Sequence, residues 1–488
     1  RSTHCISSAA SDVYKRQAME LCRDLQRGES SSAELMSETY RRINSVNPQV
    51  NALVNVIDEE LAIQEANKCD AVPIADRGPL HGLPMAIKDL IAVKGLPTTM
   101  GFVPFADNIA SEDDPLVSRL RSAGAVIIGH TNTPEFGLGS HTFNQLFGKT
   151  LNPYDLTKTP GGSSGGAAVA LATEMLKLAD GSDMGGSLRN PASFCNVVGL
   201  RPSIGRMPKN RGFGWSARLS TTGPMAKTVA DTALLFSIIA GPHDSDPLTL
   251  PEAGSTFLDG MIPLNDLKNA RIAYSPSLNN LPIDSQVTEI VASAANTFAD
   301  LGCQVEENQP DLSKAMTVFQ TQRALNLKVL GDNLDKSIPN WKAYAKETAI
   351  WNINKGKELT TDEIVQAELT RSEIYSEASK FFEDYDALIL PAAQVPPFDH
   401  EVEWISNIDG CELETYIDWM TICCAITVTG FPAISVPAGF TKTGLPVGLQ
   451  IVGKPRGDLA LLRLAGAFEA ATQYYKKRPK ICAIDDMT

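Results

Sequence analysis

The chain has 488 residues, of which 43% are hydrophobic and 20% charged, and its formal net charge at pH 7 is −14. This length and apolar content suffice for a large folded core, and the acidic balance argues against a nucleic-acid-binding surface or an anionic membrane as partner. Because no run of about 18 apolar residues occurs, we expect no membrane-spanning helix.

The first residues, 1–17, carry neither an apolar core nor any helical or strand periodicity. We therefore expect them to be a non-native or disordered stretch and exclude them from the fold. Two helices should follow from Ala18 onward. Ser31 and Glu34 form a capping-box pattern at the start of the second helix, and Asn47-Pro48 is expected to end it.

The segment 78–101 predicts a short apolar strand that carries Lys88 and is bounded by glycine and proline. A lone lysine in a strand usually reaches solvent with its tip, so this lysine becomes a candidate only in combination with other residues. A helix over 115–124, a buried strand over 125–130 and a loop over 131–148 are predicted next.

Two glycine-framed serines follow, Ser163 in PGGSSGG and Ser187 in GSDMGGSLR. Glycines beside a serine allow the backbone to approach a substrate and allow consecutive N–H groups to point at one oxygen. Either motif alone is more typical of an ordinary turn, but the pair indicates a nucleophile with its oxyanion hole. The candidate donors are the backbone N–H groups of Met184, Gly185, Gly186 and Ser187.

One alternative uses the same residues, because 161–165 also fits the G-x-S-x-G elbow of α/β-hydrolases, with Ser163 as nucleophile. That elbow requires a strand directly before it, whereas 151–160 is polar and contains two prolines. His243 and His400 are the histidines available to such an elbow, and both lie in proline-containing stretches. We therefore interpret them as loop residues.

The second half of the chain predicts α/β architecture. A broad apolar helix over 226–241 is followed by a strand–helix–strand unit over 271–308. Residues 310–380 become helix-rich and amphipathic. A core strand is then expected within 386–398.

These motifs resemble the amidase signature family. The lysine strand (81–90), the two serine loops (159–202) and a final strand pair (432–440 and 444–453) occur in that family's order. The resemblance implies one domain over 18–488, although length alone would suggest two or three. It implies an α/β/α fold, with a large mixed twisted β-sheet covered by helices on both faces. Residues 310–380 would be a helix-rich insertion or cap.

The resemblance also implies a Ser-cisSer-Lys triad, with Ser187 as acyl-forming nucleophile, Ser163 after a cis bond as bridging serine and Lys88 as base. Lysine can act as a base only when neutral, so its ordinary pKa of about 10.4 must fall by roughly three units. We therefore expect Lys88 to be buried with no carboxylate on its amine and Asp89 to point the other way. Asp183 and Arg189 should form a buried pair.

The implied reaction is hydrolysis of amide-type C–N bonds through an acyl-enzyme, without metal or cofactor. Small-molecule amides, esters and carbamates present the same carbonyl, and the chain is also similar to the metagenome-derived urethanases of this family. A mostly neutral set of pocket candidates favours an uncharged substrate. The substrate contacts expected from the family are Gly137, Leu138, Gly139 and Ser140.

Two other functions stay open, a non-catalytic amidase-like binding scaffold and a glutamine-dependent amidotransferase subunit. The intact triad argues against the first, and the second needs a partner and would not hydrolyse simple amides alone.

The nine cysteines show no C-x-x-C spacing, which indicates neither disulfides nor a zinc site. Free thiols predict a reducing compartment, so we expect a cytoplasmic protein. We also expect it to be a monomer or a homodimer.

Overall fold

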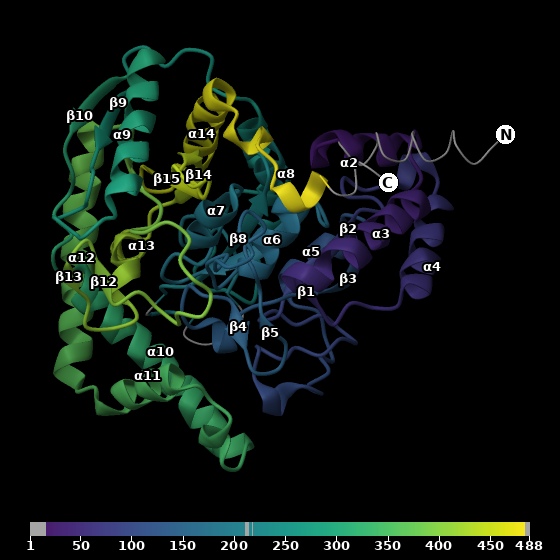
Figure 1. The fold of residues 1–488 in the computed structure, drawn as a ribbon, viewed down its shortest axis with the longest axis horizontal. Helices are drawn as coiled ribbons and strands as arrows, with labels where there is room; N and C mark the ends of the chain where they lie inside the picture. Colours follow the sequence, from purple (N-terminus) through teal and green to yellow (C-terminus); the bar gives the residue numbers. More distant parts are fainter. Residues whose placement is uncertain (1–15, 210–213, 217, 484–488) are drawn as a thin grey trace.

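The computed structural model describes residues 16–209, 214–216 and 218–483 (Figure 1). Most of the stretch expected to lie outside the fold, residues 1–15, is outside the described residues. The structure places helix α2 at Ala18–Arg27 and α3 at Ser32–Val50, so the two predicted opening helices are confirmed.

The centre of the molecule is an eight-stranded sheet with the order β10-β9-β11-β15-β14-β7-β8-β6. The β9 strand pairs in parallel with β10 and β11, and the other neighbours are antiparallel, so the predicted mixed sheet is confirmed. The parallel pair encloses α9, as the strand–helix–strand pattern predicts. The strands are β6 Leu178–Asp183, β7 Val198–Arg201, β8 Thr221–Ala226, β9 Arg271–Tyr274, β10 Gln304–Glu307, β11 Ala387–Pro391, β14 Ala433–Phe440 and β15 Pro446–Gly453.

Helices cover both faces of this sheet because strand side chains alternate between two cores. Leu388 packs in the core with α6 and α7, whereas its neighbour Ile389 packs in the core with α8 and α14. The first face carries α6 Gly165–Ala172, α7 Arg189–Cys195 and α13 Thr421–Thr429. The second carries α5 Pro115–Ser122, α8 Val229–Ile239, α9 Ser285–Asp300 and α14 Asp458–Thr472.

A second, three-stranded sheet supplies the lysine. Its order is β1-β3-β2, with β1 Leu53–Val54, β2 Pro84–Lys88 and β3 Val126–Thr131. The β2 and β3 strands are parallel, and Lys88 at the end of β2 lies opposite Thr131. Contacts between β2 and β6 join this sheet to the large one and set the lysine beside the serine loops. Helix α4, Glu59–Asp70, packs on α3.

The helix-rich segment consists of α10 Ala315–Ser337, α11 Glu347–Glu358 and α12 Thr361–Asp384, and Figure 1 shows α10 and α11 at the lower edge of the molecule. A small apolar core containing Phe102, Leu138, Leu327 and Trp341 joins α10 to the loop after β3. This packing fixes α10 against a predicted substrate-contact segment. Two short strand pairs complete the fold, β4 Phe143–Asn144 with β5 Gly148–Lys149 and β12 Asn407–Ile408 with β13 Cys411–Glu412.

The expected end of α3 at Asn47-Pro48 is wrong, since the helix continues to Val50. A proline in a last turn removes one backbone hydrogen bond without breaking the turns before it. The Asn47 side chain instead holds the chain that follows the helix, because its Oδ1 accepts from the N–H groups of Ala52 and Leu53, both at 2.9 Å. The predicted cap at the other end is present, with Ser31 accepting from Glu34 N–H.

None of the helices in the described part of the chain is both long enough and apolar enough to span a bilayer.

Helix α6 lies so close to the lysine sheet that Gly166 cannot carry a side chain. A Cβ there would lie 2.4 Å from Asn132 N and 2.6 Å from Ala52 O. Helix propensity alone would make Gly166→Ala stabilising, but this clash should lower the free energy of unfolding by about 1–3 kcal/mol in urea titrations. Gly214→Ala is the control, because its Cβ would meet no atom closer than 3.7 Å. Equal stability of the two variants would contradict this packing.

Candidate active site

The Lys88 amine is fully buried among three serine hydroxyls. Its Nζ lies 2.7 Å from Ser163 Oγ, 2.8 Å from Ser164 Oγ and 2.9 Å from Ser182 Oγ. An ammonium group would donate to all three oxygens, whereas a neutral amine has a lone pair and must accept one of the three bonds. The geometry therefore suits either protonation state.

Electrostatics favour the neutral amine. Burial lowers the pKa of Lys88 from 10.5 to about 7, although the nearby carboxylates of Asp180 and Asp183 raise it in part. Within the described residues Lys88 forms no ion pair, as expected. The predicted orientation of Asp89 is also confirmed, because its carboxylate accepts from Thr99 N–H at 2.8 Å and from the Thr99 hydroxyl.

Asp180 on β6 is a neighbour of Lys88 that sequence reasoning missed. Its Oδ1 accepts from the backbone N–H of Lys88 at 3.0 Å, and burial raises the pKa of this carboxyl to about 7. A neutral carboxyl there leaves the amine without a full counter-charge. An acidic residue within the otherwise apolar strand sequence LAD was the available signal.

The serine loop before α6 is fixed by hydroxyl groups. The peptide bond between Gly162 and Ser163 is cis, as the resemblance implied. Ser140 donates to Gly162 O at 2.9 Å, and Thr133 donates to Ser163 O at 3.0 Å. Ser164 precedes α6, yet its hydroxyl faces Lys88 and does not cap the helix.

The second serine loop, between β6 and α7, is held by a buried ion cluster. Asp183 accepts from Arg189 Nε and Nη2, both at 2.9 Å, and Arg201 Nη1 lies 3.3 Å from the same carboxylate. All three side chains are fully buried, and the two cations hold the pKa of Asp183 far below its usual range. The predicted pair of Asp183 with Arg189 is therefore confirmed, with Arg201 as an additional member.

The same carboxylate changes the predicted oxyanion donors. Gly186 N–H donates to Asp183 Oδ1 at 2.9 Å, so it is engaged and does not belong to the donor set. Among the described residues, the backbone N–H groups of Met184, Gly185 and Ser187 have no acceptor. These three are left for a substrate oxygen.

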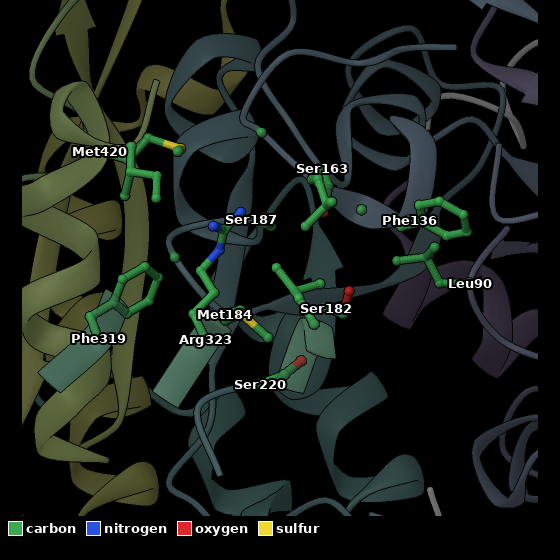
Figure 2. Close-up of a pocket in the computed structure, with 16 residues that line it drawn as sticks. Leu90, Phe136, Ser163, Ser182, Met184, Ser187, Ser220, Phe319, Arg323 and Met420 are labelled. Carbon is green, nitrogen blue, oxygen red and sulfur yellow. The ribbon is translucent and has the colours of Figure 1, made fainter. Parts of the chain in front are cut away.

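Ser163 and Ser187 open into one cleft with a volume of about 110 Å³ (Figure 2). Three of the four predicted contacts, Gly137, Leu138 and Gly139, line it. Ser140 does not, because its hydroxyl is turned to Gly162, and we leave it out of the proposed substrate contacts. The other lining residues are Leu90, Phe136, Ser182, Met184, Gly185, Ser220, Phe319, Arg323, Leu327, Ile417 and Met420.

One wall of the cleft was missed by sequence reasoning. Phe319, Arg323 and Leu327 come from α10, and Ile417 and Met420 come from the segment before α13. No local motif marks these positions, since their only pattern is the amphipathic period of a helix. The sequence-based description of a mostly neutral pocket therefore omitted one charged residue, Arg323.

The α/β-hydrolase alternative lacks its structural context. The described residues 150–162 form no strand before Ser163, and neither His243 nor His400 lines the cleft.

Among the described residues no group of histidine, cysteine and carboxylate side chains could hold a metal ion, and the eight described cysteines are free. The ninth, Cys5, lies outside the described residues.

Asp183→Asn should destabilise the protein strongly. Removing the charge leaves two buried guanidinium groups without a counter-ion, which costs about 3–5 kcal/mol of unfolding free energy in urea titrations. The control is Asp332→Asn, which removes a surface pair with Lys328 and should cost at most about 0.5 kcal/mol. A small effect of Asp183→Asn would show that the ion cluster is not what holds the Ser187 loop.

Comparisons with known proteins agree on one family. The family model described as Amidase matches residues 34–462. The acylamidase of Rhodococcus erythropolis is 35% identical over 477 residues, covering 96% of this chain and 98% of that protein. A glutamyl-tRNA(Gln) amidotransferase subunit of Dehalococcoides mccartyi is 33% identical over 497 residues, covering 96% of this chain and 100% of that protein. The crystal structure of a bacterial aryl acylamidase of the amidase signature family superposes with a TM-score of 0.88 at 26% identity, covering 96% of this chain and 98% of that chain.

Proposed function

The chain belongs to the amidase signature family of amide-hydrolysing enzymes, and on that premise we propose that it cleaves amide-type C–N bonds through an acyl-enzyme on Ser187. The observation that carries the proposal is the Lys88 amine. It is buried, it has no carboxylate partner among the described residues, and it lies 2.7 Å from Ser163 Oγ in the cleft that Ser187 also lines.

The mechanism begins with proton transfer. Neutral Lys88 takes the proton of the Ser163 hydroxyl while Ser163 Oγ takes that of Ser187, and Ser187 Oγ attacks the substrate carbonyl. The N–H groups of Met184, Gly185 and Ser187 donate to the developing oxyanion. As the C–N bond breaks, the leaving amine receives the proton through the same two groups, and the acyl group stays on Ser187. Water then attacks the ester, and the reverse proton transfers release the acid.

The substrate class follows from the cleft. Its lining is predominantly apolar, which suits aryl or alkyl groups on either side of the scissile bond. Amides, esters and carbamates are all substrates for this chemistry, and with a carbamate the intermediate on Ser187 is a carbamoyl or carbonate ester. We include urethanase activity in the proposal because of the resemblance to urethanases of this family. The α10 wall of the cleft supports the proposed role of 310–380 as a cap on a single domain.

A second candidate function is that of a glutamine-dependent amidotransferase subunit, which the similarity to the Dehalococcoides mccartyi protein favours. The two functions differ in what the isolated chain does. A free-standing hydrolase turns over simple anilides alone, whereas an amidotransferase component would need its partner. The cytoplasmic location and the monomeric or homodimeric state stay predictions.

The pH dependence tests the role of Lys88. Because only the neutral amine accepts a proton, kcat/KM for an anilide should fall about tenfold per pH unit below about pH 7 and level off above it. Asp180 raises the pKa of Lys88. Asp180→Asn should therefore lower the pH at which kcat/KM begins to fall. A profile that is flat from pH 5 to 8 in the wild type would exclude Lys88 as the base.

The nucleophile is tested by mass spectrometry of the intact protein after reaction with a fluorophosphonate. The wild type should gain one adduct, Ser187→Ala none, and Ser163→Ala and Lys88→Met should react at least about a hundredfold more slowly. Ser372→Ala, on the exposed face of α12, is the control and should react like the wild type. An adduct that persists in Ser187→Ala and disappears in Ser163→Ala would assign the nucleophile to Ser163 instead.

A further inference from the structure

Arg323 is the charged residue of the catalytic cleft. Among the described residues that line the cleft it alone carries a formal charge, and it is only 5% exposed. In Figure 2 the nitrogen-bearing end of Arg323 points toward the part of the cleft where Ser187 is labelled. A guanidinium group is therefore built into an otherwise apolar and hydroxyl-lined site.

The partners of this guanidinium are neutral. Nη1 donates to Asn352 Oδ1, Nη2 donates to the Tyr416 hydroxyl, and the group lies 5.3 Å from the centre of the Tyr416 ring. Arg323 forms no ion pair in the described part of the chain, in contrast to the buried Arg189 and Arg201. A guanidinium has five N–H donors, so these two bonds orient the group and leave donors unused.

A second cavity that Arg323 borders supplies no counter-charge to its guanidinium group. This second cavity, of about 200 Å³, shares Arg323 and Ile417 with the catalytic cleft. Of its two carboxylates, Glu358 lies 3.6 Å from Lys355 and Glu363 caps α12 through Thr360, so neither pairs with Arg323.

A lysine also lies near this wall, and the carboxylates of Glu135 and Glu403 face its charge. Lys346 donates to the carbonyl of Leu138, which lines the catalytic cleft. The backbone N–H of Lys346 donates to Glu135 Oε1. Glu135 forms no ion pair with Arg323 among the described residues. A buried cation without an anion is unfavourable, so the wall is electrostatically complementary to an anionic ligand.

We propose that Arg323 recognises a carboxylate of the substrate, so that the preferred substrates are amides whose acyl group carries a carboxylate within reach of α10. This inference rests on the proposed function and refines its substrate class. It replaces the expectation of an uncharged substrate, which was formed from pocket candidates that did not include α10. Arg323 would act as a specificity-determining residue and take no part in proton transfer.

A matched pair of substrates tests the proposal. Succinyl-4-nitroanilide ends in a carboxylate, and levulinoyl-4-nitroanilide replaces it with an uncharged methyl ketone of similar size. The wild type should have a KM at least about tenfold lower for the succinyl compound, because bonds from guanidinium to carboxylate are charge-assisted. Arg323→Met should remove that preference with little change in kcat, and Arg323→Lys should restore part of it.

The control variant is Lys355→Met, which removes one positive charge from the second cavity and does not line the catalytic cleft. It should keep the preference for the succinyl compound. Thermal unfolding and fluorophosphonate labelling of each variant separate a folding defect from a loss of recognition. An equal KM for the two anilides in the wild type, or a preference that survives Arg323→Met, would overturn the proposal.

The inference and the proposed function can fail separately. Calorimetric binding of the two anilides to Ser187→Ala protein, with and without Arg323→Met, measures recognition without turnover. Binding of the succinyl compound that depends on Arg323, without hydrolysis by the wild type, would contradict the proposed function alone. Hydrolysis that depends on Ser187 but is indifferent to the carboxylate would contradict this inference alone.

Discussion

The burial of one amine is the constraint on which the site depends. Lys88 ends a strand of the small sheet and is enclosed by Ser163, Ser164 and Ser182, so its charged form loses solvation and gains no paired carboxylate. An exposed lysine would remain protonated at neutral pH, and an ion-paired lysine would do so even more strongly. The contact of the small sheet with β6 therefore has a chemical consequence, because it closes the lysine off from water.

The nucleophile loop uses the opposite arrangement of charge. Asp183 is as buried as Lys88, but Arg189 and Arg201 pair with it, and it also accepts from Gly186 and Leu188 N–H. A paired buried charge has a fixed position, and this one shapes the turn that carries Ser187. The two loops thus separate two tasks. In the proposed mechanism, one loop surrounds the base and lowers its pKa, and the other positions the nucleophile and the oxyanion donors.

The sequence predicted the parts of the site that depend on local chemistry. Lys88, Ser163 and Ser187 stand in short motifs of glycine, serine and apolar residues, and the Asp183–Arg189 pair spans only six positions. Ser182 and Ser164 could not be assigned to Lys88, because the direction of a serine hydroxyl depends on strands that meet only in the folded chain. The engagement of Gly186 by Asp183 likewise depends on the geometry of the turn.

The wall formed by α10 could not be predicted for a related reason. Arg323 lies more than a hundred positions after Ser187, and its helix has no pattern other than amphipathic periodicity. The mixed sheet was implied by the family resemblance, but its strand order was not predicted. The helix end at Pro48 was also misplaced, because α3 continues to Val50. Local motifs therefore indicate the proposed reaction, whereas long-range packing forms the α10 wall of the cleft.

The proposed role of Lys88 as the base is tested most directly by titration of Lys88 itself. NMR of protein labelled at the lysine Cε, with Lys88→Met protein to assign the resonance, measures the pKa of this amine without any substrate. The burial of Lys88 predicts a transition near pH 7, below those of the buried Lys177 and Lys346, whose pKa values burial lowers to about 8. A Lys88 resonance that titrates near 10.5 would mean that the amine is charged at neutral pH, and the lysine could not then be the base.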